Sequence, residues 1–400
     1  MQQNETYPDV SPTQLAAIDA LLRGATITRA VEEGEENPAY LREQLITYIG
    51  NKRSLLGAIE TAVQQVCART GKDRLRVADA FAGSGIVSRM MRKYAASLVS
   101  NDIEDYARVV AECYLTNANE VPLADLRELI SQFNFVAESE PVTNGFIRRL
   151  YAPRDEAAIT PEDRVFYTID NAQRLDTYRA LIETAPEALR AYLLGPLLSA
   201  ASVHANTAGV FKGFYKERGS GKGKFGGTGA DALNRITAPI TMKLPVLSRF
   251  NCETEVLQMN SNELAGKLRG CDFAYFDPPY NQHPYGSNYF MLNLLVRNEE
   301  PSEISAVSGI PANWQRSDYN VRSKAPLRLF ELLEEIDSQF VLLSYNSEGF
   351  VAPEELREVL HGLGRVDEVQ LNYNTYRGSR NLRDRPIHVT EHLYLLEKGA

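Results

Sequence analysis

The hydrophobic pattern between residues 74 and 117 alternates between two periods. Short apolar runs that end in glycine or polar residues predict strands over 74–81 and 97–101. Apolar residues spaced three and four apart predict helices over 86–96 and 104–117. This strand–helix–strand–helix order predicts a parallel sheet with right-handed crossovers.

The alternation stops between residues 120 and 245. Helical patterns occur there over 122–133, 172–184 and 187–198, without convincing pairs of strands. We therefore predict a mainly helical insert over 121–245, which divides a sheet domain made of 41–120 and 246–400. Residues 1–40 are acidic and weakly patterned, and we interpret them as an arm or a short helix.

The alternation resumes after the insert. The pattern predicts strands over 255–259, 271–276 and 340–345, a helix over 263–267, and a helix over 353–360 that Gly362 stops. Two last strands, 368–373 and 388–396, form a predicted hairpin around an arginine-rich loop. The predicted fold class is therefore α/β, with a mostly parallel sheet whose last strand is antiparallel.

Composition places the chain among ordinary globular proteins. Its 400 residues are 44% hydrophobic and 24% charged, and no apolar run approaches the roughly 20 residues of a membrane span. The acidic start has neither the basic nor the apolar region of a secretory signal. Four scattered cysteines form no CxxC pair, which argues against a zinc or disulfide framework and favours a reducing cytoplasm.

The net charge of −9 argues against a nucleic-acid partner, but such a partner needs only a local positive face. Two basic stretches, 212–224 and 376–385, could form that face. The first is not a phosphate-binding P-loop, because Phe225 follows Lys224 where that loop needs serine or threonine. The candidate nucleic-acid contacts in these stretches are Lys212, Lys216, Lys222, Lys224, Arg377, Arg380 and Arg383.

A glycine motif, Asp79-Ala-Phe81-Ala-Gly83-Ser-Gly85, joins the first predicted strand to its helix. Its glycines allow a sharp turn, and the helix N-terminus offers free N–H groups to a polar ligand. Asp102, at the end of the next strand, can accept hydrogen bonds from both hydroxyls of a ribose. Ser88 replaces the third glycine of a dinucleotide fingerprint, so this motif alone leaves nicotinamide, S-adenosylmethionine and a structural turn open.

A second motif, Asp277-Pro278-Pro279-Tyr280, follows the strand predicted over 271–276. Two prolines fix the backbone and remove two N–H donors, so that the carbonyl groups face outward. Hydrogen bonds from an adenine amino group to the Asp277 carboxylate and the Pro278 carbonyl would free the lone pair of that nitrogen, and Tyr280 would stack on the base. The motif therefore favours methyl transfer from S-adenosylmethionine over hydride transfer.

The order of these motifs resembles that of the α-group of DNA adenine-N6 methyltransferases, the Dam-like class. Tyr48-Ile49-Gly50-Asn51-Lys52-Arg53 resembles the motif that precedes the glycine loop in this family, and the resemblance covers 42–118 and 250–400. It implies a Rossmann-like S-adenosylmethionine-dependent methyltransferase fold with an inserted target-recognition domain. It further implies a site-specific enzyme that flips an adenine out of double-stranded DNA.

The resemblance also implies residue roles. Lys52 and the backbone near Gly50 and Asn51 would hold the methionine part of the cofactor, and Asp102 its ribose. Asn262 stands where the family usually has an acid near the cofactor adenine. The full predicted cofactor set is Tyr48, Gly50, Asn51, Lys52, Asp79, Phe81, Gly83, Gly85, Asp102 and Asn262. Asn281, Tyr285 and Tyr289 are expected to line the pocket of the flipped base or the gap it leaves.

Other functions stay open at this point. A related enzyme could methylate cytosine N4, adenine in RNA or a glutamine amide; the chain could also be a non-catalytic DNA-binding module or a nicotinamide dehydrogenase. Asp277 and the large insert favour adenine in DNA. The scattered cysteines favour a cytoplasmic protein, and we expect a monomer or weak dimer. The resemblance suggests a cognate restriction endonuclease as a candidate partner.

One motif is rejected as a metal site. His388-Val-Thr-Glu391-His392 matches a zinc-binding H-x-x-E-H pattern, which needs a helix so that both histidines share a face. Apolar residues alternate along this segment instead, which predicts a strand.

Overall fold

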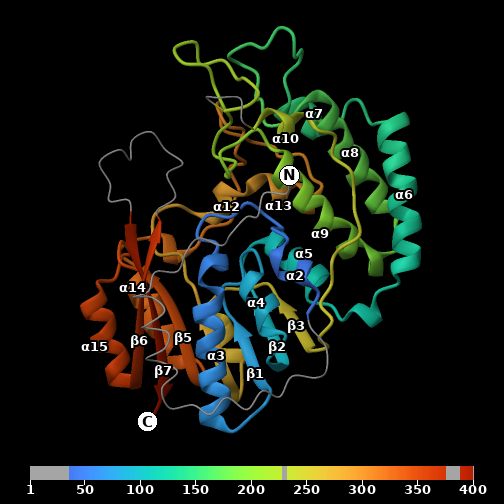
Figure 1. Cartoon of the computed structure of the whole chain (residues 1–400). Helices are drawn as coiled ribbons and strands as arrows, with labels where there is room; N and C mark the ends of the chain where they lie inside the picture. Colours follow the sequence, from blue (N-terminus) through green and yellow to red (C-terminus); the bar gives the residue numbers. More distant parts are fainter. Residues whose placement is uncertain (1–35, 228–231, 375–387, 400) are drawn as a thin grey trace, which may run out of the picture.

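A seven-stranded sheet organises the molecule, in the order β3-β2-β1-β4-β5-β7-β6 (Figure 1). The computed structural model describes residues 36–227, 232–374 and 388–399. The strands are β1 (Leu75–Asp79), β2 (Ala95–Asn101), β3 (Glu253–Leu257), β4 (Cys271–Phe276), β5 (Ser338–Asn346), β6 (Gly364–Asn374) and β7 (His388–Lys398).

The strand directions confirm the predicted sheet. Strands β1 to β5 pair in parallel, whereas β7 pairs antiparallel with both β5 and β6. Because β7 is reversed, it begins at the edge where the parallel strands end, and Asn346 of β5 lies opposite Glu391 of β7. Residues from both kinds of strand therefore reach the same edge of the sheet.

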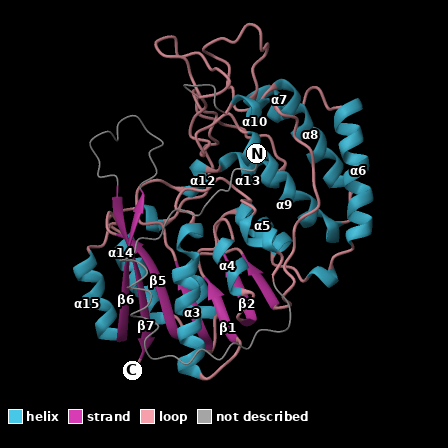
Figure 2. Cartoon of the chain, viewed as in Figure 1, coloured by secondary structure: helices cyan, strands magenta, loops and turns pink. Residues whose placement is uncertain are grey.

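Helices cover both faces of the sheet, which gives three layers (Figure 2). One face packs against α3 (Leu56–Thr70), α4 (Ile86–Met91) and α5 (Asp105–Tyr114). The other packs against α11 (Ser261–Lys267), α14 (Ala325–Glu335) and α15 (Pro353–Leu363). Strand β4, in the middle, is buried at every position, as expected for a strand covered on both faces.

The segment predicted as an insert is helical in the structure. It contains α6 (Leu123–Ser139), α7 (Phe146–Tyr151), α8 (Ile169–Thr184), α9 (Glu187–His204) and α10 (Leu233–Thr237), all between β2 and β3 in the chain. Together with α5 and α13 (Phe290–Arg297), helices α6 to α9 form one hydrophobic cluster. Helix α9 approaches α5 closely at Gly195, where a Cβ atom would lie 2.7 Å from the Cys113 sulfur.

Several predicted boundaries differ from the structure. The helix predicted over 86–96 ends at Met91, because the Leu75 amide donates to the Tyr94 carbonyl and the chain joins the sheet from Ala95. Gly362 does not end α15; the helix continues to Leu363 and stops at Gly364, where β6 begins. Strand β3 begins two residues earlier than predicted.

Short elements complete the described chain. The sequence analysis did not predict α13 or α14 (Ala325–Glu335), although both carry apolar residues at helical spacing. The remaining elements are α2 (Pro38–Arg42), η1 (Lys52–Leu55), η2 (Ala118–Glu120), α12 (Tyr285–Asn288) and η3 (Asp318–Asn320).

Candidate active site

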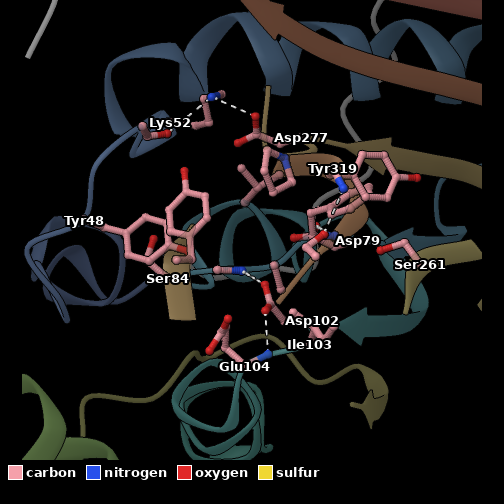
Figure 3. A pocket seen from close by; sticks show the side chains of 18 of the residues that line it. Tyr48, Lys52, Asp79, Ser84, Asp102, Ile103, Glu104, Ser261, Asp277 and Tyr319 are labelled. Carbon is pink, nitrogen blue, oxygen red and sulfur yellow. Dashed lines mark hydrogen bonds and ion pairs between the residues drawn. The ribbon is translucent and has the colours of Figure 1, made fainter. Parts of the chain in front are cut away.

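A cavity with an empty volume of about 840 Å³ opens at the carboxyl edge of β1, β2 and β4 (Figure 3). Ligands of open parallel sheets bind at this edge. Most of the residues predicted from the motifs line the cavity: Tyr48, Gly50, Asn51, Lys52, Asp79, Phe81, Gly83, Asp102, Asp277 and Pro279. The predicted residues Gly85, Asn262, Pro278 and Tyr280 are not among its lining residues.

The glycine loop forms one wall of the cavity. Gly83 and Gly85 have φ of 52° and 72°, a conformation that favours glycine. A Cβ atom on Gly83 would lie only 2.8 Å from the Tyr48 hydroxyl, so the turn also depends on the missing side chain. The Gly83 amide donates to Asp102 Oδ2 (2.8 Å), which ties the loop to the end of β2.

Asp102 holds two backbone segments together. Besides the bond from the glycine loop, its Oδ1 accepts a hydrogen bond from the Glu104 amide (2.9 Å) at the start of α5. Burial raises the pKa of Asp102, against the lowering effect of these backbone bonds. Each carboxylate oxygen has two acceptor sites, so Asp102 can still accept hydrogen bonds from a ligand in the cavity.

Asp79 stabilises the glycine loop by accepting hydrogen bonds from residues on either side of it. Its side chain is fully buried and accepts a hydrogen bond from the Ser88 hydroxyl (2.6 Å). Burial raises the pKa of Asp79 to about 7. Ser88, which interrupts the dinucleotide fingerprint, thus takes part in a buried bond that holds the acid at the end of β1.

The opposite end of the cavity carries a buried charge cluster. Lys52, at the start of η1, places its Nζ 2.9 Å from Asp277 Oδ1 and 3.2 Å from Glu391 Oε1. Burial would lower the pKa of Lys52, but the two carboxylates raise it well above its usual range, so the amine stays an ammonium. Burial raises the pKa of Asp277 to about 6, although Lys52 opposes this rise.

Glu391 was not predicted as a site residue. It is 3% exposed, and it accepts hydrogen bonds from the Ser344 hydroxyl (2.7 Å) and the Asn346 amide group (3.0 Å). Burial would raise its pKa, but Lys52 and these two donors hold it below the usual range of a glutamate. Glu391 stands in the same alternation as Val389, Leu393 and Leu395, and an acid among these apolar positions was the signal that could have revealed it.

The strand prediction for the H-x-x-E-H segment is confirmed. Successive residues of β7 point to opposite faces of the sheet, so Glu391 reaches Lys52 while His392 lies 2.8 Å from Glu368. Glu391 and His392 therefore have different partners on different faces of the sheet.

Aromatic residues line the side of the cavity between its two ends. The ring of Tyr48 stacks on Tyr285 (5.0 Å) and on Tyr289 (4.9 Å). The Tyr285 hydroxyl donates to the Ile49 carbonyl, and the Ile49 amide donates to the Tyr289 hydroxyl. Tyr285 lines this cavity, whereas Tyr289 is fully buried behind it and supports the stack.

The second motif continues beyond the charge cluster. Tyr280 packs edge-on against Tyr345 of β5, and the Lys52 ammonium lies 6.0 Å from the centre of its ring. The Phe350 amide donates to the Tyr280 carbonyl. These contacts fix the chain on the far side of Pro279.

A comparison of the sequence with known protein families agrees with the motif order. Residues 48–359 match the model of the D12 class N6 adenine-specific DNA methyltransferases. The chain belongs to this family.

Named relatives agree with the assignment. The type II methyltransferase M.NlaIII of Neisseria lactamica is 27% identical over 88% of this chain and 99% of its own. M.CviAII of Paramecium bursaria Chlorella virus 1 is 28% identical over 83% and 93%, respectively. The modification methylase LlaI of Lactococcus lactis subsp. lactis is 30% identical over 82% of this chain and 51% of its own.

Membership of this family decides between the functions that the sequence left open. The chain is an N6 adenine-specific DNA methyltransferase by family, which sets it apart from the cytosine N4, RNA, glutamine and dehydrogenase alternatives. Within the described residues, no helix combines the length and apolar character that crossing a membrane requires.

Asn262 reaches the cavity of the methyltransferase only indirectly. Its amide group donates to the Arg328 carbonyl (2.9 Å), and its Oδ1 accepts from the Tyr319 hydroxyl (3.0 Å). Asn260 and Ser261, its neighbours, line the cavity instead. Tyr319, which packs edge-on against Phe81 at 5.1 Å, is thereby held in the cavity wall.

The wall that includes Tyr319 was missed in the sequence. Gln315, Ser317 and Asn320 also line the cavity, from the chain that leads into and through η3. This chain comes close because Gly286 of α12 has no side chain: a Cβ atom there would lie 2.3 Å from the Gln315 carbonyl oxygen. Loop residues without a motif carry no sequence signal for such a contact.

The basic stretch 212–224 contributes no residue to the cavity lining, and its two halves pair with each other. Lys216 forms a bridge with Gly223, and the Glu217 amide donates to the Lys222 carbonyl. Lys212 and Lys222 are exposed, and Lys216 and Lys224 partly so. Loops extend from the same end of the molecule as α7 and α10 (Figure 2). The other predicted DNA contacts, Arg377, Arg380 and Arg383, lie outside the described residues.

Proposed function

We propose that this methyltransferase uses S-adenosylmethionine to methylate adenine N6 at a short specific sequence in double-stranded DNA. The observation that carries the proposal is the shape of one cavity, with Asp102 at one end and Asp277 at the other. The carboxyl groups of Asp102 and Asp277 both line it, which suits a positively charged ligand. The sulfonium cofactor has that charge.

Residues of the cavity have distinct roles in holding the cofactor. Asp102 would accept the ribose hydroxyls, since both of its oxygens are already fixed by backbone donors. Phe81 and Tyr319 would enclose the adenine of the cofactor, with Asn262 positioning Tyr319. Gly83, Gly50 and the Tyr48 ring would border its methionine part, on the side towards Lys52. When bound, the cofactor supplies an electrophilic methyl group.

The second motif would orient the target base. Asp277 and the Pro278 carbonyl would accept hydrogen bonds from the adenine amino group, which turns the nitrogen lone pair towards the methyl carbon. Tyr280 would stack on the base. Catalysis would then come mainly from the positioning of the amine and from the exclusion of water.

Access to a paired adenine requires base flipping, which costs a few kcal/mol for each duplex base. We assign residues 121–245 to target recognition and residues 41–120 and 246–400 to catalysis. Lys212, Lys216, Lys222 and Lys224 would contact phosphates, because a positive surface supplies much of the affinity for DNA. Arg377, Arg380 and Arg383, which stand between β6 and β7 in the sequence, would clamp DNA phosphates.

The names of the relatives support a biological setting. Type II methyltransferases and modification methylases are among them. The protein would act in the cytoplasm as a monomer or weak dimer and protect DNA from a cognate restriction endonuclease.

The deciding experiment uses purified protein, tritiated S-adenosylmethionine and unmethylated plasmid DNA, followed by nucleoside analysis. We expect label in N6-methyladenine, no label with Asp277→Ala, and retained label with Asp272→Asn. Asp272 is a matched control because it lies at the other end of β4, where it pairs with Lys72. Label in cytosine or only in RNA would contradict the proposal.

A further inference from the structure

Lys52 lies between two carboxylates, and only one of them belongs to a motif. Asp277 follows β4, whereas Glu391 lies on the reversed strand β7. The ammonium is 6% exposed and Glu391 3% exposed, so neither charge is balanced by bulk water. The cluster joins η1, the end of β4 and the start of β7.

The charges in this cluster do not cancel. One ammonium faces two carboxylates, and the additional partners of Glu391, the Ser344 hydroxyl and the Asn346 amide group, are neutral donors. The other titratable groups around Lys52 and Asp277 are uncharged tyrosines or more distant acids: Tyr275, Tyr280, Tyr285 and Asp79. With both carboxylates ionised, the cluster carries a net charge of one electron beside the cavity.

We propose that Glu391 is a positioning residue for methyl transfer, which acts through Lys52 to hold the Asp277 carboxylate in place and to keep a net negative charge beside the target amine. This inference rests on the proposed function. Lys52 engages Asp277 through Oδ1, and we assign Oδ2 to the amine.

Because Lys52 is shared with Glu391, the Asp277 carboxylate is a stronger hydrogen-bond acceptor for the target amine. If Lys52 had Asp277 as its only anionic partner, the ammonium would cancel the charge of that carboxylate and compete with the amine for it. Glu391, 3.2 Å from Nζ, draws part of the ammonium's interaction away from Asp277. Its own two neutral donors keep it in place for this role.

The net charge also matches the charge movement of the reaction. During transfer, the nitrogen–carbon bond forms while the carbon–sulfur bond breaks, and the electron pair of the broken bond stays on sulfur. Positive charge therefore passes from sulfur to N6, which afterwards releases a proton to solvent. A fixed negative charge next to N6 stabilises the transition state more than the ground state, and only such a difference accelerates the step.

The test compares Glu391→Gln with Glu397→Gln. Glu397 lies on the same strand and pairs with Arg69, about 20 Å further along at the spacing of a β-strand. For E391Q we expect kcat to fall on the order of tenfold to a hundredfold, because one preorganised electrostatic group is weakened. The KM values for cofactor and DNA should stay within about twofold, since the uniform binding of both substrates is untouched. E397Q should match the wild type.

A pH profile separates positioning from a merely structural role. Glu391 raises the pKa of Asp277, so E391Q should move the acid limb of kcat to lower pH. Glu391→Asp keeps the charge and should leave the acid limb in place, with kcat reduced severalfold because the shorter side chain is further from Lys52. A loss of fold would instead reduce activity at every pH, with a lower melting temperature and weaker cofactor binding.

A double variant shows whether the effect passes through Lys52. In a Lys52→Met background, E391Q should cause a smaller loss of kcat than in the wild type, because the part of the effect that passes through Lys52 is already gone. The inference is overturned by an E391Q kcat within twofold of wild type, an unmoved acid limb, or an equal loss in both backgrounds. If E391Q does not fold, a wild-type kcat in E391D overturns it. Wild-type labelling of N6-methyladenine that Asp277→Ala abolishes tests the proposed function separately.

Discussion

Replacing Lys52 with methionine should destabilise the protein in a pH-dependent way. The change keeps most of the side-chain volume and removes a buried ammonium that has carboxylate oxygens at 2.9 and 3.2 Å. At an effective dielectric constant of about 20, each contact is worth about 5–6 kcal/mol before desolvation. Desolvation of the three charges offsets most of this, and removal of one partner of a buried pair typically costs about 3–5 kcal/mol. That is a large part of a total stability of about 5–15 kcal/mol.

The sign of the pH dependence follows from the carboxylates left behind. Without the ammonium, the pKa values of Asp277 and Glu391 in the folded protein rise above those of the unfolded chain. Groups with raised folded pKa values prefer the folded state when protonated. The loss is therefore full above the raised values and disappears as the pH falls towards the unfolded values near 4.

Denaturant unfolding at pH 5.5 and pH 8 measures this difference. We expect a loss of about 3–5 kcal/mol at pH 8 and a clearly smaller one at pH 5.5, with an unchanged m-value. Lys93→Met is the control: Lys93 pairs with Glu60 at 3.0 Å but is one-third exposed, so its loss should stay below about 1 kcal/mol at both pH values. A K52M loss below about 1 kcal/mol at pH 8, or an equal loss at both pH values, would refute the reasoning.

Three further outcomes are expected. First, kcat/KM should fall about tenfold per pH unit below about pH 6, because Asp277 must be ionised and its pKa is about 6; a profile that stays level to pH 5 would contradict this role. Second, Gly83→Ala should weaken cofactor binding by at least tenfold in equilibrium dialysis, since its φ of 52° costs about 1 kcal/mol and its Cβ would meet a tyrosine hydroxyl at 2.8 Å. Gly57→Ala, in α3 with no atom within 4 Å of its Cβ, should bind normally, and equal affinities of the two variants would exclude the proposed close contact. Third, Lys222→Ala should reduce the salt dependence of DNA binding, measured as log K against log salt, by about 0.9, whereas Lys267→Ala on α11 should not; an unchanged slope would remove Lys222 from the interface.

The sequence predicted those parts of the fold in which local pattern and tertiary environment agree. Strand β4 lies at the predicted residues because CDFAYF is apolar and bounded by a turn motif. The helix after the glycine loop was predicted too long, since helical spacing continues past Met91 while the Leu75 amide pulls Tyr94 towards the sheet. The hydrogen bond between Leu75 and Tyr94 is a tertiary contact, so the local sequence carries no signal that it will end the helix.

The site residues also fall into those that local motifs predicted and those that depend on tertiary contacts. Asp102 and Asp277 carry their chemistry in short motifs at strand ends, so that their common cavity follows from the parallel sheet. Glu391 needs the knowledge that β7 is reversed and lies beside β5, which brings its first residues to the catalytic edge. Gln315 depends on the absence of a side chain at Gly286, a contact between two loops that no periodicity encodes.

The position of β7 between β5 and β6 also sets the order in which the sheet can be completed during synthesis. During synthesis, at about 5–20 residues per second, the glycine loop and Asp102 emerge early, whereas Glu391 emerges after β6. Strand β6 has no partner in the described sheet except β7, so it must wait for the reversed strand before it can pair. A nascent chain therefore lacks the completed charge cluster and presents an open strand edge, which favours association with other chains. Only a chain that has inserted β7 joins Lys52, Asp277 and Glu391, so the charge cluster forms together with the β5–β7–β6 part of the sheet.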